Sequence, residues 1–372
     1  MTSYTPLTDV IVTKRNIENC SFSKWYPLFK GHTPKSKILK PVPHEFIQYL
    51  KQDGIKLPYD QEEKSFYTSN IERNDENDYS DWEDSELVTD ENLEIESNSI
   101  NPLVHFSEFH SQLKDIIRDL GPVTPKLNWS APRDATWILP NNSMKCNEVN
   151  EIYLLLNASN YIMHDLEHAY DECQKDTNDV VIPETELILR EWFDVNPALE
   201  FRVFVKDRRI IGVTQRDLNY YDYLEALSNT FKDLIDEFVE DVVLPKFPDK
   251  SFVLDVYIPR PFNKVYLIDI NPFARKTDSL LFSWNELITH DNTVVDESGE
   301  DAASSDYELR LITENNTGRF ASKEHSENQV PSDVVEASLN PGAISELVQK
   351  WKELLNKQEE DSGDECNGEN GQ

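Results

Sequence analysis

Glycine and cysteine are both scarce in this sequence. The 372 residues include ten glycines and four cysteines, which are Cys20, Cys146, Cys173 and Cys366. The phosphate-binding motif G-x-x-x-x-G-K-[S/T] is absent, which excludes a P-loop ATPase, and the motif set of the protein kinases is absent as well. The cysteines form no C-x-x-C pair and lack zinc-ligand spacing, so we interpret them as free thiols in a reducing compartment.

Long apolar runs are also missing. No uninterrupted apolar stretch approaches the ~20 residues that a membrane-spanning helix needs. The N-terminus, MTSYTPLTDVIVTKRN, lacks the apolar core of a signal peptide. We therefore expect a soluble, cytoplasmic protein that binds no membrane and is a monomer on its own.

Basic residues are outnumbered by acidic ones. The chain has 36 Lys and Arg residues against 70 Asp and Glu residues, a formal net charge of -34 at pH 7. A surface this acidic repels phosphate backbones, which argues against nucleic-acid binding. A basic protein partner fits the charge better, as does a set of solvated acidic segments that inflates the count.

The acidic residues concentrate in segments without apolar periodicity. Residues 74–100, 289–306 and 358–372 have the composition of disordered chain. The other regions are expected to be an N-terminal packed segment (1–73), an N-terminal lobe (101–190), a C-terminal lobe (191–288) and a C-terminal segment (307–357).

Apolar periodicity in the two lobes predicts both helices and strands. One helix should include Phe106 and Ile117 and end at Gly121, and an amphipathic helix is predicted from Leu227 to Val242. Further helices are expected from about Ser279 and over residues 344–355. Strands are predicted over residues 125–138, 186–192, 199–206, 209–216, 252–257 and 264–271. The predicted fold class is α+β, with antiparallel sheets in two lobes.

The most informative stretch is a predicted β-hairpin over residues 252–273, FVLDVYIPRPFNKVYLIDINPF. A turn at residues 261–263 places Asp255 opposite Asp269, with Cβ atoms ~4.5–5.5 Å apart. Asn271 points to the same face as Asp269, because side chains alternate along a strand with period two. This register is an assumption, and an odd slip would move one aspartate to the opposite face.

Two opposed carboxylates repel each other, and burying them without compensation is costly. A hard divalent cation relieves both problems. Mg²⁺ is typically held by one or two carboxylates together with phosphate oxygens and water. We therefore predict a Mg²⁺ site at Asp255, Asp269 and Asn271; the alternative is an exposed sheet face with unpaired acids.

The order D…D-x-N on two strands before a helix resembles the metal-binding end of the ATP-grasp fold. The usual form there is D…E-x-N, so Asp269 stands where glutamate is commoner. The resemblance implies a cleft that binds ATP with Mg²⁺. Such a cleft needs cations for the phosphates and a hinge segment for the adenine.

Several residues are candidates for the phosphates. Lys126 suits the α- and β-phosphates as a point charge, and Ala131, Arg133 and Asp134 follow it in the same stretch. Arg133 and Asp134 alternatively form a structural ion pair. Further candidates are Arg216, Arg275 and Lys276.

Adenine and ribose contacts fall on the next two predicted strands. Residues 186–193 resemble the strand that leads into the adenine hinge of ATP-grasp proteins. Glu200 stands at the spacing of a ribose-binding carboxylate, and Arg202 shares its face and could reach phosphate. The alternative for Glu200 and Arg202 is a surface cross-strand pair. The candidates at the hinge are Arg190, Glu191, Trp192 and Phe193.

Two histidines also have a spacing found in metal sites. His164 and His168 lie four residues apart on a possible helix, with Asp165 between them. No third ligand is evident, so we expect solvated helix residues there instead.

Longer stretches carry a more specific resemblance, to the cell division cycle protein 123 family and to its fungal members in particular. It extends from about residue 12 to about residue 356 and is interrupted by the acidic segments. The stretches are PKLNWSAPRDATWI, EFRVFVK, QRDLNYYDY, FVLDVYIPRPFNKVYLIDINPFARKTDSLLFSW and NTGRFASKEHSEN.

This resemblance implies an atypical ATP-grasp protein that binds ATP and Mg²⁺. It implies an assembly chaperone that binds the gamma subunit of translation initiation factor 2 and promotes formation of the heterotrimer. It also implies that the C-terminal region contributes to gamma-subunit binding, although core packing explains the same apolar side chains. These are Leu347, Val348, Trp351 and Leu354.

Two other functions would use the same cleft. An ATP-grasp ligase would activate a carboxylate as an acyl-phosphate and needs cations beside the γ-phosphate, a role open to Arg216, Arg275 and Lys276. A pure interaction module would have a degenerate nucleotide site, but Lys126 together with the predicted metal ligands argues against that. We expect an ATP-binding chaperone rather than a ligase.

Overall fold

The computed structural model describes residues 10–52, 54–60, 65–67, 101–171, 173, 184–290 and 307–314. All of them belong to the first of two compact units, which spans residues 1–317. Several predicted features therefore lie outside the described residues. These are the acidic segment 74–100, most of 289–306, the helix over 344–355 and the tail 358–372.

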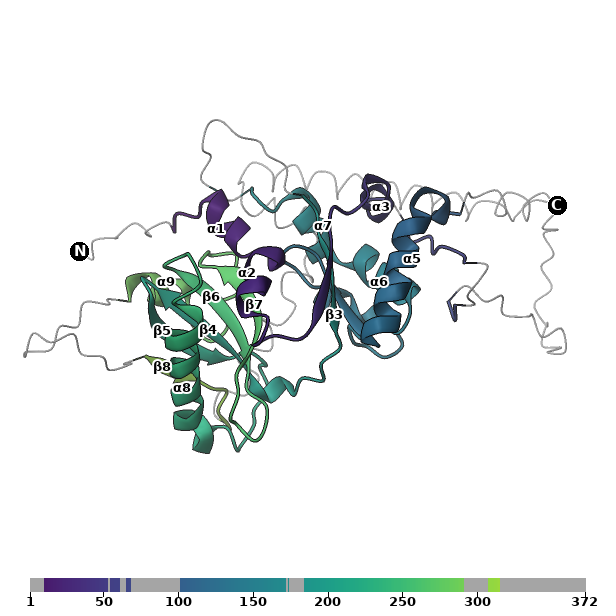
Figure 1. Cartoon of the computed structure of the whole chain (residues 1–372). Coiled ribbons are helices and arrows are strands. Elements are labelled where there is room, and N and C mark those ends of the chain that lie inside the picture. Colours follow the sequence, from purple (N-terminus) through teal and green to yellow (C-terminus); the bar gives the residue numbers. More distant parts are fainter. Residues whose placement is uncertain are drawn as a thin grey trace, which may run out of the picture. The chain divides into compact units, whose positions relative to one another are not determined.

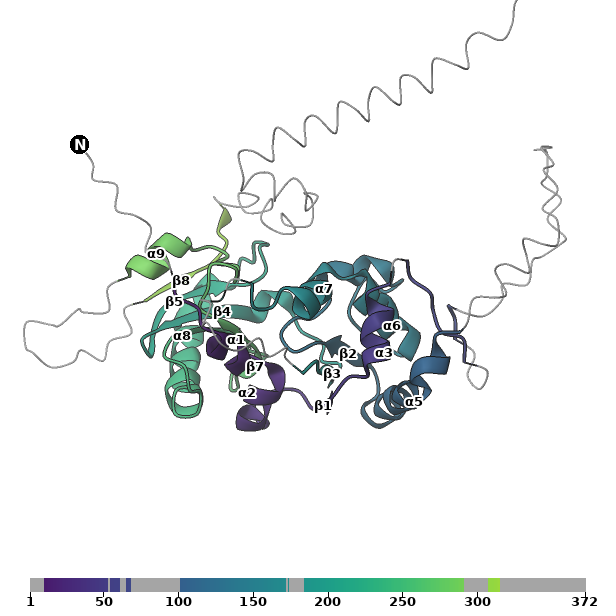
Figure 2. The same ribbon diagram turned by 90° about the horizontal axis from the view of Figure 1, so that it is seen from above.

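The smaller sheet has three antiparallel strands in the order β1-β3-β2, of which β3 is labelled in Figure 1. β3 (Leu187–Glu191) lies between β1 (Ser36–Leu39) and β2 (Val123–Lys126). Three helices pack on this sheet in one hydrophobic cluster: α3 (His44–Leu50), α5 (Leu103–Leu120) and α6 (Val149–Ala158). Figure 2 shows these helices grouped around the sheet.

The larger sheet has five strands in the order β7-β6-β4-β5-β8. Its neighbours are antiparallel except for β5 and β8, which are parallel. The strands are β4 (Glu200–Lys206), β5 (Arg209–Gln215), β6 (Phe252–Tyr257), β7 (Tyr266–Pro272) and β8 (Glu308–Arg310). The predicted α+β class with antiparallel sheets is confirmed.

Side-chain alternation along β4 separates the two faces of the larger sheet. Phe201, Val203 and Val205 join the cluster formed with α2 (Phe22–Phe29) and α8 (Ser228–Glu237). Phe204 joins the opposite cluster, which includes Leu287 of α9 (Trp284–Thr289). The remaining helical elements are α1 (Lys14–Asn19), α7 (Asn160–Glu167), the 3-10 helices η1 (Arg133–Ile138), η2 (Pro197–Leu199) and η3 (Glu225–Leu227), and the π-helix η4 (Phe238–Val243).

The N-terminal segment completes the hydrophobic clusters of both sheets. Phe22 and Trp25 of α2 are fully buried in the cluster of the larger sheet. Phe46 of α3 is fully buried in the cluster of the smaller sheet. The segment predicted as an N-terminal packed region is therefore shared between the two cores.

Three predicted elements have other boundaries. The strand predicted over residues 125–138 ends at Lys126, and η1 follows Pro132, which has no N–H to donate to a strand ladder. The helix predicted from Leu227 to Val242 is α8 preceded by a 3-10 turn and followed by π-helical η4. The helix expected from about Ser279 begins at Trp284, where Ser283 and Glu286 form a capping box.

Gly121 ends α5, as predicted, with φ 77° and ψ -151°. Only glycine adopts this region without strain, so Gly121→Ala should lower the free energy of unfolding by ~1–3 kcal/mol. A Cβ at Gly121 would meet no atom within 4 Å, so the loss reports backbone strain alone. Urea denaturation measures this loss of stability. Gly31→Ala is the control, because a Cβ at Gly31 would also meet no atom within 4 Å and the φ angle of Gly31 is not positive. Equal midpoints for the two variants would contradict the assignment.

Within the described residues, no helix has both the length and the apolar character needed to cross a membrane.

Candidate functional site

The β6–β7 hairpin pairs Asp255 with Asp269, as predicted. The predicted turn register is wrong, however, because Tyr257 lies opposite Tyr266 and Val256 opposite Leu267. A β-bulge next to Asp255 then leaves Ile268 as an extra residue on β7 and brings the two aspartates opposite each other. The predicted register is wrong by one residue at the turn, and the bulge shifts it back by one residue. The predicted pair of Asp255 and Asp269 is therefore correct although the predicted turn is not.

The carboxylate of Asp255 is buried and forms a bidentate ion pair with Arg202 of β4. Arg202 Nε and one terminal nitrogen donate to the two carboxylate oxygens at 2.7 and 2.8 Å. Arg216 Nε lies 3.2 Å from the carboxylate, within ion-pair distance although not in hydrogen-bond geometry. Burial alone would raise the pKa of Asp255, but Arg202 and Arg216 outweigh burial and lower the pKa to about 2.

The structure shows Arg202 in an ion pair with Asp255, whereas the sequence first suggested a contact with phosphate. Arg202 lies opposite Asp255 in the β4–β6 ladder, so the alternative of a cross-strand pair is what the structure shows, but the pair is buried. The second terminal nitrogen of Arg202 donates to the carbonyl oxygen of Asp278 at 2.7 Å. Arg202 thus connects the carboxylate of β6 to the loop that follows β7.

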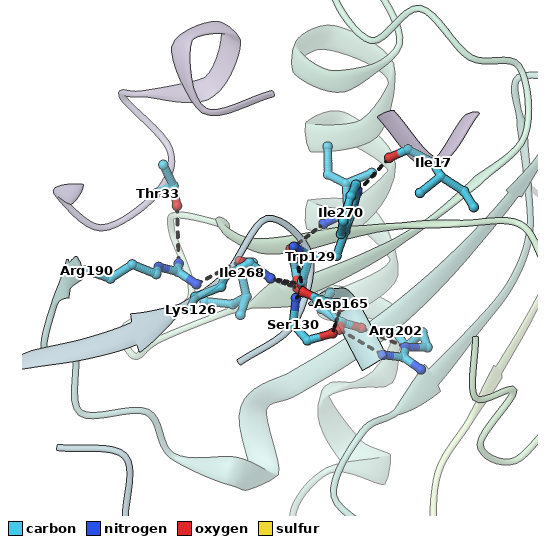
Figure 3. A network of polar contacts seen from close by, with 12 residues as sticks. Ile17, Thr33, Lys126, Trp129, Ser130, Asp165, Arg190, Arg202, Ile268 and Ile270 are labelled. Atoms are coloured by element: carbon cyan, nitrogen blue, oxygen red, sulfur yellow. Dashed lines mark hydrogen bonds and ion pairs between the residues drawn. The ribbon is translucent and has the colours of Figure 1, made fainter. Parts of the chain in front are cut away.

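Asp269 is paired with Lys126 across the two sheets; Figure 3 shows Lys126 within this network of polar contacts. Lys126 Nζ lies 2.7 Å from Asp269 Oδ2 and also donates to the carbonyl oxygen of Trp129. The Lys126 side chain is 2% exposed and the Asp269 side chain 20% exposed. The last residue of β2 is thereby joined to β7, and the residues predicted for phosphate and for metal contact each other directly.

Glu200 completes the charged cluster at the start of β4. One of its carboxylate oxygens lies 3.8 Å from Arg216. Burial, followed by the charges of Asp255 and Asp217, raises the pKa of Glu200 to about 8. Burial and the neighbouring carboxylates therefore favour the protonated form of Glu200 over the charged one.

The donor set of the predicted metal site fits Mg²⁺ in chemistry. Two carboxylates and the amide of Asn271, which lies two residues after Asp269 on β7, supply hard oxygen ligands. A carboxylate has about four lone-pair sites. Asp255 is already approached by three guanidinium nitrogens, whereas Asp269 receives Lys126 and the Ile270 N–H. More acceptor capacity therefore remains on Asp269. Among the described residues, no group of three His, Cys, Asp or Glu side chains is arranged to hold a metal ion by itself.

The predicted hinge residues are engaged in several contacts. The N–H groups of Glu191 and Trp192 donate to the carbonyl oxygens of Lys35 and Pro122, both at 2.8 Å, so these two donors already have partners. Arg190, whose pKa is lowered by burial, donates to the carbonyl oxygen of the bulged Ile268 at 3.0 Å. The ring of Phe193 packs against Tyr257 and Tyr266 of the hairpin.

Three further candidates follow the turn after β2. Asp134 accepts hydrogen bonds from Ser159 Oγ at 2.5 Å and from the Asn160 N–H at 2.7 Å, so it holds the N-terminus of α7. The Arg133 side chain is exposed, and the Arg133 N–H donates to the Ala131 carbonyl oxygen at 2.8 Å. The structure shows Asp134 in this capping contact and not in an ion pair with Arg133.

Sequence reasoning missed the part played by α7. Asp165 is buried and accepts hydrogen bonds from Trp129 and Ser130, so the expectation of a solvated residue is wrong. His164 contacts Lys276 of the loop after β7, and burial, followed by the charge of Lys276, lowers the pKa of His164 to about 4. The helical spacing gave the correct element, but a single turn of sequence does not show which side is covered.

Two cavities lie elsewhere in the described part of the chain. One of about 160 Å³ is lined by α9 and β8 residues that include Glu286 and Arg310. The other, of about 490 Å³, is lined by Phe66, Tyr67 and the start of α6. Neither is lined by the charged residues of the candidate site, so that site rests on the chemistry of its side chains.

Comparison with known proteins places the chain in a family. The profile of the D123 family matches residues 25–338, which is most of the chain. The chain therefore belongs to the D123 family.

Individual relatives cover nearly the whole chain. It is 64% identical over 362 residues to Cell division cycle protein 123 of Candida glabrata, with 97% of this chain and 98% of the relative covered. It is 60% identical over 373 residues to the Translation initiation factor eIF2 assembly protein of Vanderwaltozyma polyspora, with 99% and 100% covered.

The solved structure of Cdc123 from Schizosaccharomyces pombe is similar, with a TM-score of 0.63 and 35% identity over 82% of this chain and 99% of that one. The resemblance to the cell division cycle protein 123 family is thereby confirmed.

Proposed function

We propose that this protein binds Mg-ATP at the ion-paired cluster and acts as an assembly chaperone for translation initiation factor 2. The observation that carries the nucleotide site is the pairing itself. Lys126 and Arg216, proposed for phosphate, lie against Asp269 and Asp255, proposed for Mg²⁺. The names of relatives called eIF2 assembly protein support the chaperone role. The ATP-grasp architecture implied by the family resemblance belongs to the same proposal.

The residues of the cluster have complementary roles in this proposal. Asp269 and Asn271, with the remaining acceptor capacity of Asp255, would hold Mg²⁺, which when bound neutralises phosphate charge. Lys126 and Arg216 would each exchange a carboxylate oxygen for a phosphate oxygen. Such an exchange retains a charge-assisted contact for each cation, so neither is left buried and unpaired.

The gamma subunit is the proposed direct contact within the factor. The support for this is the family resemblance together with the strong excess of acidic residues, which suits a basic partner surface. The apolar residues proposed for that contact, between 347 and 354, lie outside the described residues.

Reconstitution with purified subunits tests the function. The full chain should co-elute with the gamma subunit in size-exclusion chromatography. It should also raise the yield of heterotrimer when the alpha and beta subunits are added with Mg-ATP. Asp115→Ala is a suitable control, because Asp115 is an exposed residue of α5 that is paired with nearby Arg118. Failure to associate with the gamma subunit with ATP, with ADP and without nucleotide would overturn the proposal.

A further inference from the structure

The turn between β2 and η1 fixes the ammonium group of Lys126. The Leu127 N–H donates to the Ser130 carbonyl oxygen at 2.9 Å, which closes the turn. Lys126 Nζ reaches back to the carbonyl oxygen of Trp129 within the same turn. The position of the ammonium group therefore depends on how the peptide between Trp129 and Ser130 is oriented.

Asp165 of α7 holds that same peptide from its other side (Figure 3). Asp165 Oδ2 accepts the Ser130 N–H at 2.7 Å and the Trp129 N–H at 3.2 Å, and Oδ1 accepts Ser130 Oγ at 2.7 Å. The Ser130 N–H and the Trp129 carbonyl belong to one planar trans peptide, so they point in opposite directions. Fixing the N–H on Asp165 therefore aims the carbonyl at Lys126.

Hydrogen bonds hold both the helix that carries Asp165 and the turn that Asp165 contacts. Its helix is capped by Ser159, whose Oγ accepts the Ile162 N–H and donates to Asp134. On the opposite side, the indole N–H of Trp129 donates to the carbonyl oxygen of Ile17 at 2.8 Å. The turn is thus held from α7 and from α1, and Asp165 is the contact that orients its central peptide.

We propose that Asp165 is a positioning residue, which orients the Trp129–Ser130 peptide and through it places the Lys126 ammonium group for the phosphates of ATP. This inference rests on the proposed function for its final step, the phosphate contact. The positioning step itself concerns only this chain.

Asp165 is also an unusual choice for a purely structural contact. Burial raises the pKa of Asp165 to about 6, although the hydrogen bonds from Ser130 and Trp129 and the charge of Lys126 oppose this shift. Lys126 is the charged side chain that faces it from β2. A carboxylate kept in such a place despite its desolvation is consistent with a role beyond stability.

The first test needs no nucleotide. Asp165→Ala removes the acceptor of the Ser130 and Trp129 N–H groups, whereas an Asn side chain could still accept from both with its amide oxygen. Reductive methylation of the full-length chain, quantified at Lys126 by mass spectrometry, should be several-fold faster in this variant, because the Trp129 carbonyl oxygen, one of the two acceptors of the ammonium group, is no longer held in place. Glu151→Ala is the matched control. Glu151 is another buried carboxylate, which accepts N–H groups of Asn147 and Glu148 before α6 and does not touch the turn.

A double-mutant cycle with Lys126→Met then links the position to ATP. Calorimetry with Mg-ATP should show Asp165→Ala weakening binding on the order of tenfold in the wild-type background, as for loss of a charge-assisted contact. In the Lys126→Met background the same substitution should have little further effect. Circular dichroism and melting curves confirm that each variant is folded.

The outcomes separate the two proposals. Unchanged labelling of Lys126 in Asp165→Ala, or an equal increase in Glu151→Ala, would overturn the positioning role whatever ATP does. Faster labelling combined with an unchanged ATP affinity of Lys126→Met would retain the positioning of the ammonium group and overturn the phosphate contact of the proposed function. Additive losses in the cycle would show that Asp165 acts on ATP by a route other than Lys126 and would also overturn the inference.

Discussion

Asp255→Ala should lower the free energy of unfolding by ~3–5 kcal/mol, because removing one partner of a buried ion pair leaves the other buried and uncompensated. Arg202 is fully enclosed and would lose both of its hydrogen bonds to the carboxylate. Arg216 would lose a contact at 3.2 Å in the same step. Urea denaturation followed by circular dichroism gives the change in midpoint and slope.

An exposed pair of the same chemistry is the control for this loss. Asp115 and Arg118 on α5 are 2.7 Å apart, but their side chains are 69% and 74% exposed. Surface pairs contribute ~0–1 kcal/mol, so Asp115→Ala should change stability little. Comparable losses for the two variants would show that burial of the Asp255–Arg202 pair does not dominate its energetics.

The pH dependence of stability gives a second readout of Asp255. Its pKa of about 2 lies below the ordinary value, so the unfolded chain binds its proton first as the pH falls. The stabilisation is fully present above the unfolded pKa of ~3.9 and is lost as the pH falls through about 2. Wild-type protein should therefore lose stability in this window, and Asp255→Ala should show a shallower acid limb.

Asp269→Ala should abolish measurable Mg-ATP binding in a chain that remains folded, with some loss of stability because buried Lys126 loses its carboxylate partner. Asp269 is the carboxylate with the greater remaining acceptor capacity, and its side chain is partly exposed. The substitution removes a proposed metal ligand and at the same time releases Lys126 from its partner. We expect a loss of affinity larger than the ~10–100-fold that follows when only the support of a metal ligand is removed.

Calorimetry with ATP in Mg²⁺ and in EDTA measures this effect. Asp269→Asn separates the charge from the shape, since it retains one neutral oxygen at the same place. The loss should be large in Mg²⁺ and small in EDTA, because the proposed role acts through the cation. Equal affinities of wild type and Asp269→Ala in Mg²⁺ would remove Asp269 from the metal site.

Much of the hairpin could be predicted from the sequence because its chemistry is local. Alternation along two strong strands brings Asp255 and Asp269 together with the correct partner. The bulge at Ile268 could not be predicted, since Arg190, which donates a hydrogen bond to the carbonyl oxygen of Ile268, lies on another sheet. The predicted pair is correct only because the one-residue error at the turn and the one-residue shift at the bulge cancel.

The partners of the charged residues were harder to predict. The sequence named Lys126, Arg202 and Arg216 as candidates for contact with phosphate, and that role stays a prediction. It did not indicate that each of them is ion-paired with a carboxylate of the predicted metal site. Lys126 and Asp269 are 143 residues apart in the chain, and no periodic pattern carries information over that separation.

The parallel strand β8 has a consequence for experiments that shorten the chain. It pairs with Gly212, Val213 and Thr214 and so covers the outer edge of β5. A C-terminal truncation that ends the chain before residue 307 would remove β8 and leave those backbone groups without their neighbouring strand. An uncovered sheet edge favours strand addition and aggregation. A truncation intended to delete the proposed partner-binding region should therefore begin after residue 314; otherwise loss of binding and loss of solubility would be confounded.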